Sequence, residues 1–228
     1  MTIDVLTLFS EMFTGVISSS IIKRAIADKK VTINLHNFRD FSKDIHHKVD
    51  DTPYGGGCGM ILACQPIFDC VNSLRRENSK VILLTPDGTV YNQEIAGSLS
   101  KEEHLILICG HYEGFDERIR SICDMELSIG DYVLTGGEVP AMVLIDSITR
   151  LLDGVINKES YENDSFYQGL LDYPQYTKPR VYNGLEVPEV LLSGNHQKIA
   201  EFRKVQALER TKLRRPDLLK GDINNGNL

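Results

Sequence analysis

Two continuous apolar runs constrain the fold more than any other feature of the sequence. Residues 81–86 are VILLTP and residues 104–110 are HLILICG. Strands that are buried on both faces, as in a parallel sheet, show such unbroken runs instead of an alternation of apolar and polar residues. Each run stops at a Pro or Gly, which predicts a turn directly after the strand. We therefore expect a parallel sheet whose loops gather at one edge.

Three further segments complete the predicted sheet. Residues 2–9 and 31–38 are rich in β-branched and apolar types, and residues 125–130 form a weaker strand pattern. Helical patterns separate the strands, and this alternation is typical of an α/β domain. In open α/β sheets, ligands bind at the carboxyl ends of the strands.

Three helices are expected from apolar spacing. The first begins near Ser10 and runs to Ile26. The second has Pro140 in its first turn, followed by one apolar stripe to Leu152. The third covers about 196–213 and is basic and amphipathic.

The composition changes after Gly154, where the polar segment NKESYENDS begins. Such a turn-prone stretch is typical of a linker between domains. We expect a first domain over residues 1–154, a flexible linker over 155–165, and a small, mainly helical domain over 166–228.

Composition, the length of the apolar stretches and the cysteine count exclude several classes of protein. The 228 residues are 42% hydrophobic and 25% charged, which argues against disorder over most of the length. No stretch reaches the roughly 20 apolar residues of a membrane span, and the first residues lack the basic start of a signal peptide. The five cysteines are odd in number and form no CxxC pair, so we expect reduced thiols and a cytoplasmic protein.

Three glycine-rich loops, GGGCG, CGHYEG and LTGGE, indicate a binding site. The sequence lacks the GxxxxGK[ST] pattern of a P-loop, and PYGGGCGM at 53–60 does not fit GxGxxG. A conventional nicotinamide-dependent oxidoreductase is therefore disfavoured. Glycine lets the backbone approach a ligand closely, so three such loops at neighbouring strand ends predict a site in which the backbone binds the ligand.

These loops also carry a resemblance to a known family. The bacterial tRNA (guanine-N1)-methyltransferases, the TrmD family, are similar from residue 1 to about 220. The motifs that carry the resemblance are PYGGGCGM, LTPDG (84–88), CGHYEGFDER (109–118), SIGDYVLTGGE (128–138), LLSGNH (191–196) and LRRPDLL (213–219). The resemblance implies methylation of N1 of guanosine 37, beside the anticodon. It also implies a SPOUT-type α/β fold with a deep C-terminal trefoil knot and a homodimer whose subunits share the active site.

The resemblance implies that S-adenosyl-L-methionine binds in the knot loops, and it also implies dependence on Mg²⁺. No cluster of carboxylates in the sequence indicates where a metal would bind, so we assign no metal ligand. The expected donor-binding residues are Leu84, Thr85, Pro86, Gly110, Tyr112, Glu113, Ser128, Ile129, Gly130, Asp131, Tyr132, Val133, Leu134, Gly136, Gly137 and Pro140.

By position in the family pattern, Asp164 is the general base and Arg150 the residue that stabilises negative charge on guanine O6. N1 of guanine carries a proton and is a poor nucleophile until a base removes it. Each residue also has a structural interpretation. Arg150 is four residues from Asp146 on one helix, so an ion pair would explain it. Asp164 would equally suit the N-cap of a helix that starts at Ser165 or Phe166.

The last helix and its flanks form a basic segment in a chain of net charge −7. A local patch of this kind can bind RNA phosphates, although a solvated helix face is the alternative. Nearby aromatic residues would stack on unpaired bases or pack in the core. These residues are Tyr161, Phe166, Tyr173 and Tyr176.

The sequence leaves the roles of two residues in the CGHYEG loop undecided. His111 stands where some members of the family carry Arg, and Glu113 would contact the acceptor base, bind a metal or stabilise the loop. Two other functions also fit a SPOUT fold, namely methylation of a different RNA base or of ribose, and RNA binding without catalysis. The Asp in ENDSF disfavours the first, and the intact SIGDYVLTGGE disfavours the second.

Overall fold

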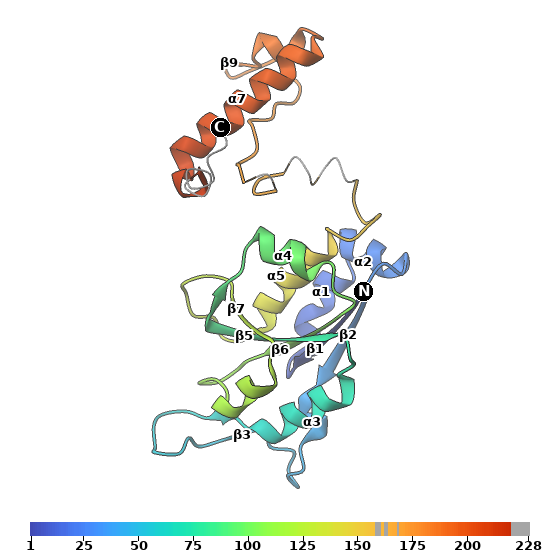
Figure 1. Cartoon of the computed structure of the whole chain (residues 1–228), viewed down its shortest axis with the longest axis vertical. Helices are drawn as coiled ribbons and strands as arrows, with labels where there is room; N and C mark the ends of the chain where they lie inside the picture. The colour runs from blue at the N-terminus through green and yellow to red at the C-terminus, as the bar shows by residue number, and fades with distance from the viewer. Residues whose placement is uncertain (158–160, 162–163, 168, 220–228) are drawn as a thin grey trace. The chain divides into compact units, whose positions relative to one another are not determined.

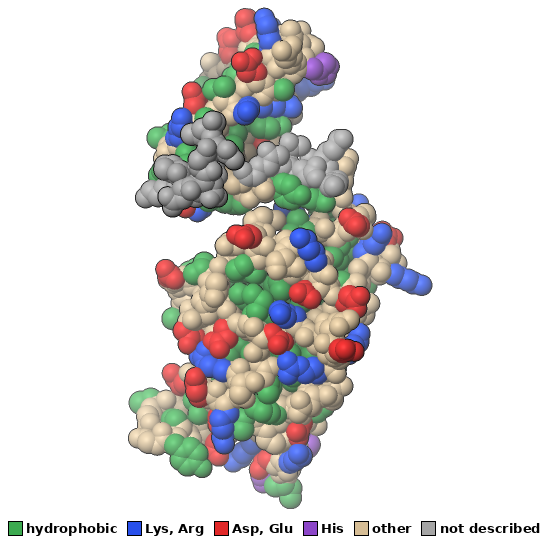
Figure 2. Space-filling model, viewed as in Figure 1, with side chains coloured by type: hydrophobic (Ala, Val, Ile, Leu, Met, Phe, Trp, Pro, Cys, Tyr) green, Lys and Arg blue, Asp and Glu red, His purple; other side chains and the backbone are tan. Residues whose placement is uncertain are grey.

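The computed structural model describes residues 1–157, 161, 164–167 and 169–219. Its chain divides into two compact units, Met1–Asn157 and Lys158–Leu228. Of the first unit, Figure 2 shows one face, on which acidic and basic side chains are intermingled.

A five-stranded parallel sheet forms the centre of the first unit, in the order β2-β1-β6-β5-β7. All five expected strands are present. They are β1 (Thr2–Thr7), β2 (Thr32–Asn37), β5 (Ser79–Val90), β6 (His104–Cys109) and β7 (Met125–Ser128). A two-stranded sheet, β3 (Asp50–Asp51) with β4 (Ile61–Leu62), lies outside the main sheet.

Helices cover both faces of the large sheet (Figure 1). The helices on one face are α1 (Thr14–Ile17), α2 (Ser20–Ala27), α4 (Gln93–Leu99) and α5 (Glu138–Thr149). The other face carries α3 (Cys64–Leu74) with the short 3₁₀ helices η2 (Phe38–Phe41) and η3 (Glu117–Ile122). Neither α3 nor α4 was predicted from the sequence.

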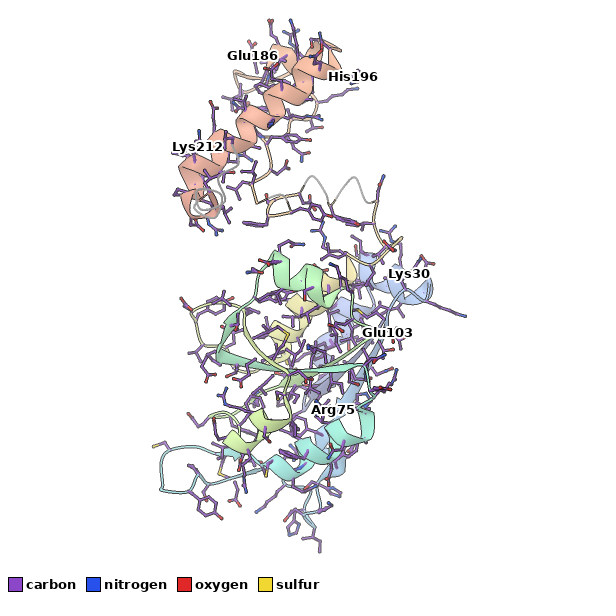
Figure 3. The ribbon with its side chains drawn as sticks, viewed as in Figure 1. Lys30, Arg75, Glu103, Glu186, His196 and Lys212 are labelled. Carbon is purple, nitrogen blue, oxygen red and sulfur yellow. The ribbon has the colours of Figure 1, made fainter. Side chains whose placement is uncertain are left out.

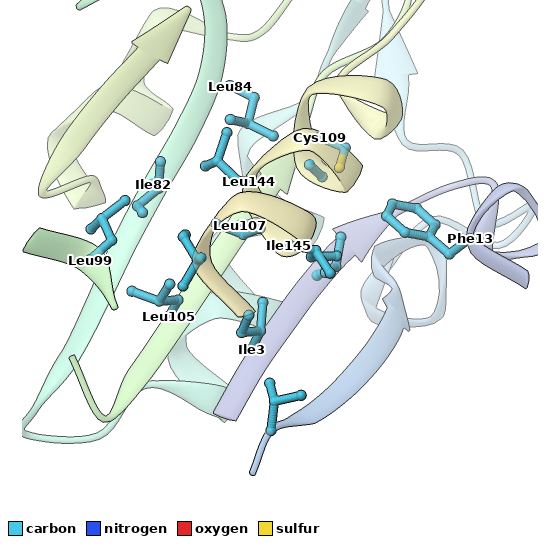
Figure 4. Close-up of a cluster of buried hydrophobic side chains, with 14 of the residues drawn as sticks. Ile3, Phe13, Ile82, Leu84, Leu99, Leu105, Leu107, Cys109, Leu144 and Ile145 are labelled. Atoms are coloured by element: carbon cyan, nitrogen blue, oxygen red, sulfur yellow. The ribbon is translucent and has the colours of Figure 1, made fainter. Parts of the chain in front are cut away.

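Strand alternation divides the core into two clusters, one on each side of the sheet. Ile82 and Leu107 point toward α4 and α5, while Leu83 and Ile106 point toward α3. Figure 4 shows the first cluster, where Leu144 of α5 lies against the sheet. Full burial of one such side chain contributes about 1.5–3 kcal/mol. The unbroken apolar runs therefore follow from burial on both faces.

The prediction of one helix from Ser10 to Ile26 was wrong. The segment contains a 3₁₀ turn, η1 (Ser10–Phe13), then α1 and α2. The Ser18 hydroxyl donates to the Thr14 carbonyl at 2.5 Å, and Ser20 has a φ of 49°. A residue in the left-handed region cannot continue a right-handed helix, so the two helices are separate.

Strand β5 is also longer than the sequence suggests. It does not end at Pro86 but continues to Val90, and both parts pair with β7. The register shifts between Leu84 and Thr89, so TPDG forms an irregularity within the strand. A bulge of this kind bends the backbone and re-aims side chains.

The second unit contains α7 (His196–Arg214), which confirms the predicted basic helix. It also contains a hairpin of β8 (Val181–Tyr182) and β9 (Leu185–Glu186), with the 3₁₀ helices η4 (Glu189–Leu192) and η5 (Pro216–Leu219). The hairpin was missed, although its Asn183-Gly184 pair is a strong turn signal. Both turn residues have positive φ, 50° and 77°.

Candidate functional site

Three loops enclose a cavity of about 240 Å³ at the carboxyl edge of the sheet. They are the TPDG irregularity in β5, the loop after β6, and the loop between β7 and α5. Parallel strands present their carboxyl ends at one edge, so the order β6-β5-β7 brings the three loops together.

The cavity collects fifteen of the sixteen residues at which the resemblance places the methyl donor. Asp131 is the exception, since it is exposed and does not line the cavity. Five lining residues were not expected, and each lies within two positions of an expected one in the chain. They are His111, Gly114, Phe115, Leu127 and Thr135.

Close backbone contact holds two of the loops together at Gly137. Its N–H donates to the Gly110 carbonyl at 2.8 Å. A Cβ on Gly137 would lie 2.6 Å from the Cα of Cys109 and 2.7 Å from the N of Gly110. Real side chains do not approach so closely, so the glycine is required by packing. The backbone of the β6 loop thereby lies directly against the start of α5.

The loop after β7 is held by its own hydrogen bonds. The Ser128 hydroxyl donates to the Gly130 carbonyl at 3.1 Å, and the Tyr132 hydroxyl donates to the Ile129 carbonyl at 3.2 Å. Gly130 has a φ of 146°, which favours glycine. These bonds fix the backbone groups that line this wall of the cavity.

The cavity wall carries little formal charge. Of the described residues that line it, Glu113 is the one carboxylate, and none is Lys or Arg. The Glu113 N–H donates to the Met60 carbonyl at 3.0 Å, and its side chain packs on Gly59. The glycine-rich segment 53–60 thus contacts the cavity through Glu113.

An ion-pair cluster braces the TPDG loop from outside. Arg120 of η3 pairs with Asp87 at 2.7 Å, with Glu117 at 3.0 Å, and with Glu126. The hydroxyl of Thr85 donates to Asp87, and this bond, together with Arg120, lowers the pKa of the Asp87 carboxyl. The loop that holds Thr85 and Pro86 is therefore fixed to η3.

The two expected catalytic residues lie in different units. Arg150 follows the last residue of α5, at the end opposite the cavity. Asp164 is half-buried in the second unit, where the Tyr167 N–H donates to its carbonyl at 3.4 Å. Residues 165–167 form a turn and not the start of a helix, so Asp164 is not a helix N-cap.

A second cavity, of about 1060 Å³, lies within the second unit. Its wall combines aromatic, apolar and basic side chains from the segment 173–180 and from α7. The Arg203 guanidinium lies over the Tyr173 ring at 4.8 Å, a contact worth about 0.5–1 kcal/mol at exposed sites. Tyr173 and Tyr176, two of the predicted stacking residues, both line this cavity.

The described residues show neither a metal-ligand cluster nor a membrane-spanning helix. Within these ranges, no group of three or more His, Cys, Asp and Glu residues is arranged to hold a metal ion. Among the same residues, no helix has the length and apolar content that crossing a membrane requires.

Comparisons with known proteins identify the family of the chain. The family model for tRNA (guanine-1)-methyltransferase TrmD matches residues 1–221. The tRNA (guanine-N(1)-)-methyltransferase of Malacoplasma penetrans is 58% identical over 218 residues, covering 96% of both chains. That of Ruminiclostridium cellulolyticum is 54% identical over 233 residues and covers all of both chains. The chain therefore belongs to the TrmD family of tRNA (guanine-1)-methyltransferases.

Proposed function

We propose that the chain transfers a methyl group from S-adenosyl-L-methionine to N1 of guanosine 37 in tRNA. Family membership over residues 1–221 supports the reaction. The observation that carries the proposal is the cavity at the sheet edge, which gathers fifteen of sixteen expected donor-binding residues from three separate loops.

The residues of this cavity fit the donor. Adenosine presents an edge and a ribose that backbone N–H and C=O groups can bind, and the β6 and β7 loops expose backbone at Gly110, Gly130 and Gly136. Leu84, Pro86 and other apolar side chains complete the wall. When bound, S-adenosylmethionine supplies a methyl group on a positively charged sulfur. A wall without Lys or Arg among its described residues suits that charge.

Activation of the acceptor is assigned to Asp164 and Arg150. The Asp164 carboxylate takes the proton from N1 of guanine, which makes N1 nucleophilic. The negative charge then spreads to O6, where the Arg150 guanidinium stabilises it. Alignment of the two substrates at about 3–3.5 Å supplies much of the remaining rate.

A homodimer with a shared active site accounts for the position of Arg150. The twelve residues of α5 separate Arg150 from the cavity end of the helix, a length of about 18 Å. This exceeds the reach of an arginine side chain, so Arg150 serves a cavity other than the one at the start of its own helix. In the same dimer, Asp164 reaches the donor of the partner subunit.

The remaining parts of the proposal concern fold and substrate binding. The segment between β7 and α5 passes through the loops of β5 and β6 as the trefoil knot of a SPOUT domain. Residues 1–154 form this catalytic domain, 155–165 the linker, and 166–228 the tRNA-binding domain. The enzyme acts in the cytoplasm, where its tRNA substrate is found. The family resemblance also implies dependence on Mg²⁺, but the described residues offer no cluster of ligands that fits such an ion.

Transfer of a labelled methyl group to a tRNA transcript tests the function. The control is a transcript in which adenosine replaces guanosine 37. We expect label in the guanosine transcript alone, in a product that digestion identifies as 1-methylguanosine. Equal labelling of the two transcripts would rule out the proposed target.

A further inference from the structure

The guanidinium of Arg120 lies where three segments of the chain meet outside the cavity at the sheet edge. Each of its three nitrogens donates to a different carboxylate: Nη2 to Asp87 at 2.7 Å, Nε to Glu117 at 3.0 Å, and Nη1 to Glu126. The Arg120 side chain is 28% exposed. A planar guanidinium with several charge-assisted bonds holds its acceptors in one arrangement.

The three carboxylates belong to the three segments that form the cavity. Asp87 is part of the TPDG irregularity of β5. Glu117 begins η3, shortly after Phe115, the last cavity residue of the β6 loop. Glu126 lies in β7, whose last residue, Ser128, lines the cavity. One cation therefore joins the outer ends of all three loops.

The contact from Arg120 reaches the cavity wall through Asp87 and Thr85. The Thr85 hydroxyl donates to Asp87, and Thr85 is buried and lines the cavity. The same loop packs directly on the β7 backbone, because a Cβ on Gly88 would lie 2.6 Å from the carbonyl carbon of Glu126. Arg120, which pairs with both β7 and the loop, holds them in this close contact.

We propose that Arg120 is a positioning residue that holds the three loops at the spacing that S-adenosylmethionine requires. The inference rests on the proposed donor. Glycine backbone forms much of the wall, and backbone cannot adapt to a ligand by a change of rotamer, so the fit depends on what holds the loops. A loop that is already ordered loses less conformational entropy on binding. Without the guanidinium, the three carboxylates would repel one another.

Arg120 acts from outside the cavity, because it does not line the wall. Its effect should therefore appear in the affinity for the donor and not in the chemical step. At saturating donor concentration the bound ligand itself holds the loops, so kcat should stay unchanged. A general loss of folding would instead lower kcat, because less of the protein would be active. The donor KM and kcat thus respond differently to a positioning role.

Calorimetric titration of S-adenosylmethionine into the full chain tests this role without using activity. Arg120→Ala should weaken donor binding about fivefold, the loss expected when a network of partly exposed ion pairs is removed. Arg75→Ala is the matched control. Arg75 is exposed and pairs with Asp124 at 3.3 Å, and neither residue lines the cavity. Both variants should lose similar thermal stability, whereas donor affinity should fall in Arg120→Ala alone.

Salt and a second variant test the link through Asp87. Salt screens exposed ion pairs, so the difference between wild type and Arg120→Ala should shrink between about 0.05 and 1 M salt. Asp87→Asn keeps an acceptor for Thr85 but loses the ion pair, and should also weaken donor binding. The double variant should bind the donor no more weakly than Arg120→Ala alone. Losses that multiply would contradict the link. Asp87→Asn also replaces Arg120→Ala in the titration should the latter fail to fold.

Equal donor affinity in wild type and folded Arg120→Ala would overturn the inference and leave the proposed function intact. An equal loss in Arg75→Ala would overturn it too, because the effect would then not depend on the three loops. In steady-state methylation, Arg120→Ala should raise the donor KM about fivefold and leave the tRNA KM and kcat unchanged. A wild type that binds no S-adenosylmethionine would refute the proposed donor itself, so the titration distinguishes the two failures.

Discussion

At the scale of single residues, Asp4 is the most heavily bonded buried carboxylate of the sheet. It is 2% exposed and accepts from Asn34 at 2.7 Å, His36 at 2.9 Å and His104 at 2.7 Å. Burial alone would raise its pKa, but the bonds from His36, Asn34 and His104 outweigh burial and lower the pKa. The other nitrogen of His104 bonds to the Ser79 hydroxyl at 2.7 Å. The cluster therefore connects β1, β2, β5 and β6.

Asp4→Asn should destabilise the first unit by about 3–5 kcal/mol, because it leaves buried donors without a charged acceptor. The folded pKa of Asp4 lies below the unfolded value of about 3.9. Its contribution is therefore complete above pH 3.9 and is lost as pH falls through the folded pKa. Urea unfolding of both proteins at neutral and acid pH measures the difference, which should shrink in acid. Asp28→Asn, at an exposed position, is the control; an equal loss there would contradict the argument.

Asp164→Asn tests the proposed base. The amide keeps the size of the side chain but cannot take the N1 proton, so turnover should fall by about 10²–10⁴-fold. The affinity for S-adenosylmethionine should change little, because Asp164 acts on N1 of guanine in the proposed reaction and does not line the cavity. Single-turnover methylation and calorimetric titration of the donor measure the two effects. An unchanged single-turnover rate would exclude the role.

At the scale of elements, the contact between the β6 loop and α5 has no room for a side chain at Gly137. Gly137→Ala would place a Cβ 2.6 Å from the Cα of Cys109 and force the two loops apart. Overpacking of this kind costs about 1–3 kcal/mol, so we expect the donor affinity to fall by roughly ten- to a hundredfold. Gly97→Ala, on α4 with open space around it, is the control. An unaltered donor affinity in folded Gly137→Ala would contradict the packing argument.

The sequence predicted the elements whose signal is local. The runs at 81–86 and 104–110 are strands, and the basic pattern at 196–213 is α7. The hairpin at 181–186 also has a local signal, which was overlooked. By contrast, the break at Ser20 depends on a backbone conformation that apolar periodicity does not report.

The residues of the cavity could be predicted where they lie in a loop that directly follows a strand. Contacts between residues that are far apart in the sequence could not be predicted. The glycine loops identified the cavity because parallel strands end at one edge. The bond between Thr7 and Glu138 joins residues 131 positions apart in sequence. The close approach of Gly137 to the backbone of Cys109 appears only once the fold brings the start of α5 against the end of β6. Contacts of this range leave no periodicity in the sequence.

At the scale of the whole molecule, charge is distributed unevenly between the parts. The chain has a net charge of −7, yet α7 has six Lys and Arg residues against two Glu. Helix α7 begins at His196 and has Lys212 near its end (Figure 3). Lys204, Lys212 and Arg214 are exposed, whereas Arg210 is half-buried and donates to the Asp172 carbonyl at 3.2 Å. The exposed side chains are therefore the ones available to tRNA phosphates.

Replacement of Lys204 and Lys212 by Ala should weaken tRNA binding and reduce its salt dependence. Each phosphate contact releases counterions, so loss of two contacts should reduce the slope of log affinity against log salt by about 2. Donor binding in the first unit should stay unchanged. The double variant is compared with Lys23→Ala, an exposed lysine of α2, in tRNA titrations between about 50 and 200 mM salt. If tRNA phosphates bind α7, the slope should fall in the double variant and not in Lys23→Ala. An equal slope in the wild type and both variants would place the phosphate contacts elsewhere.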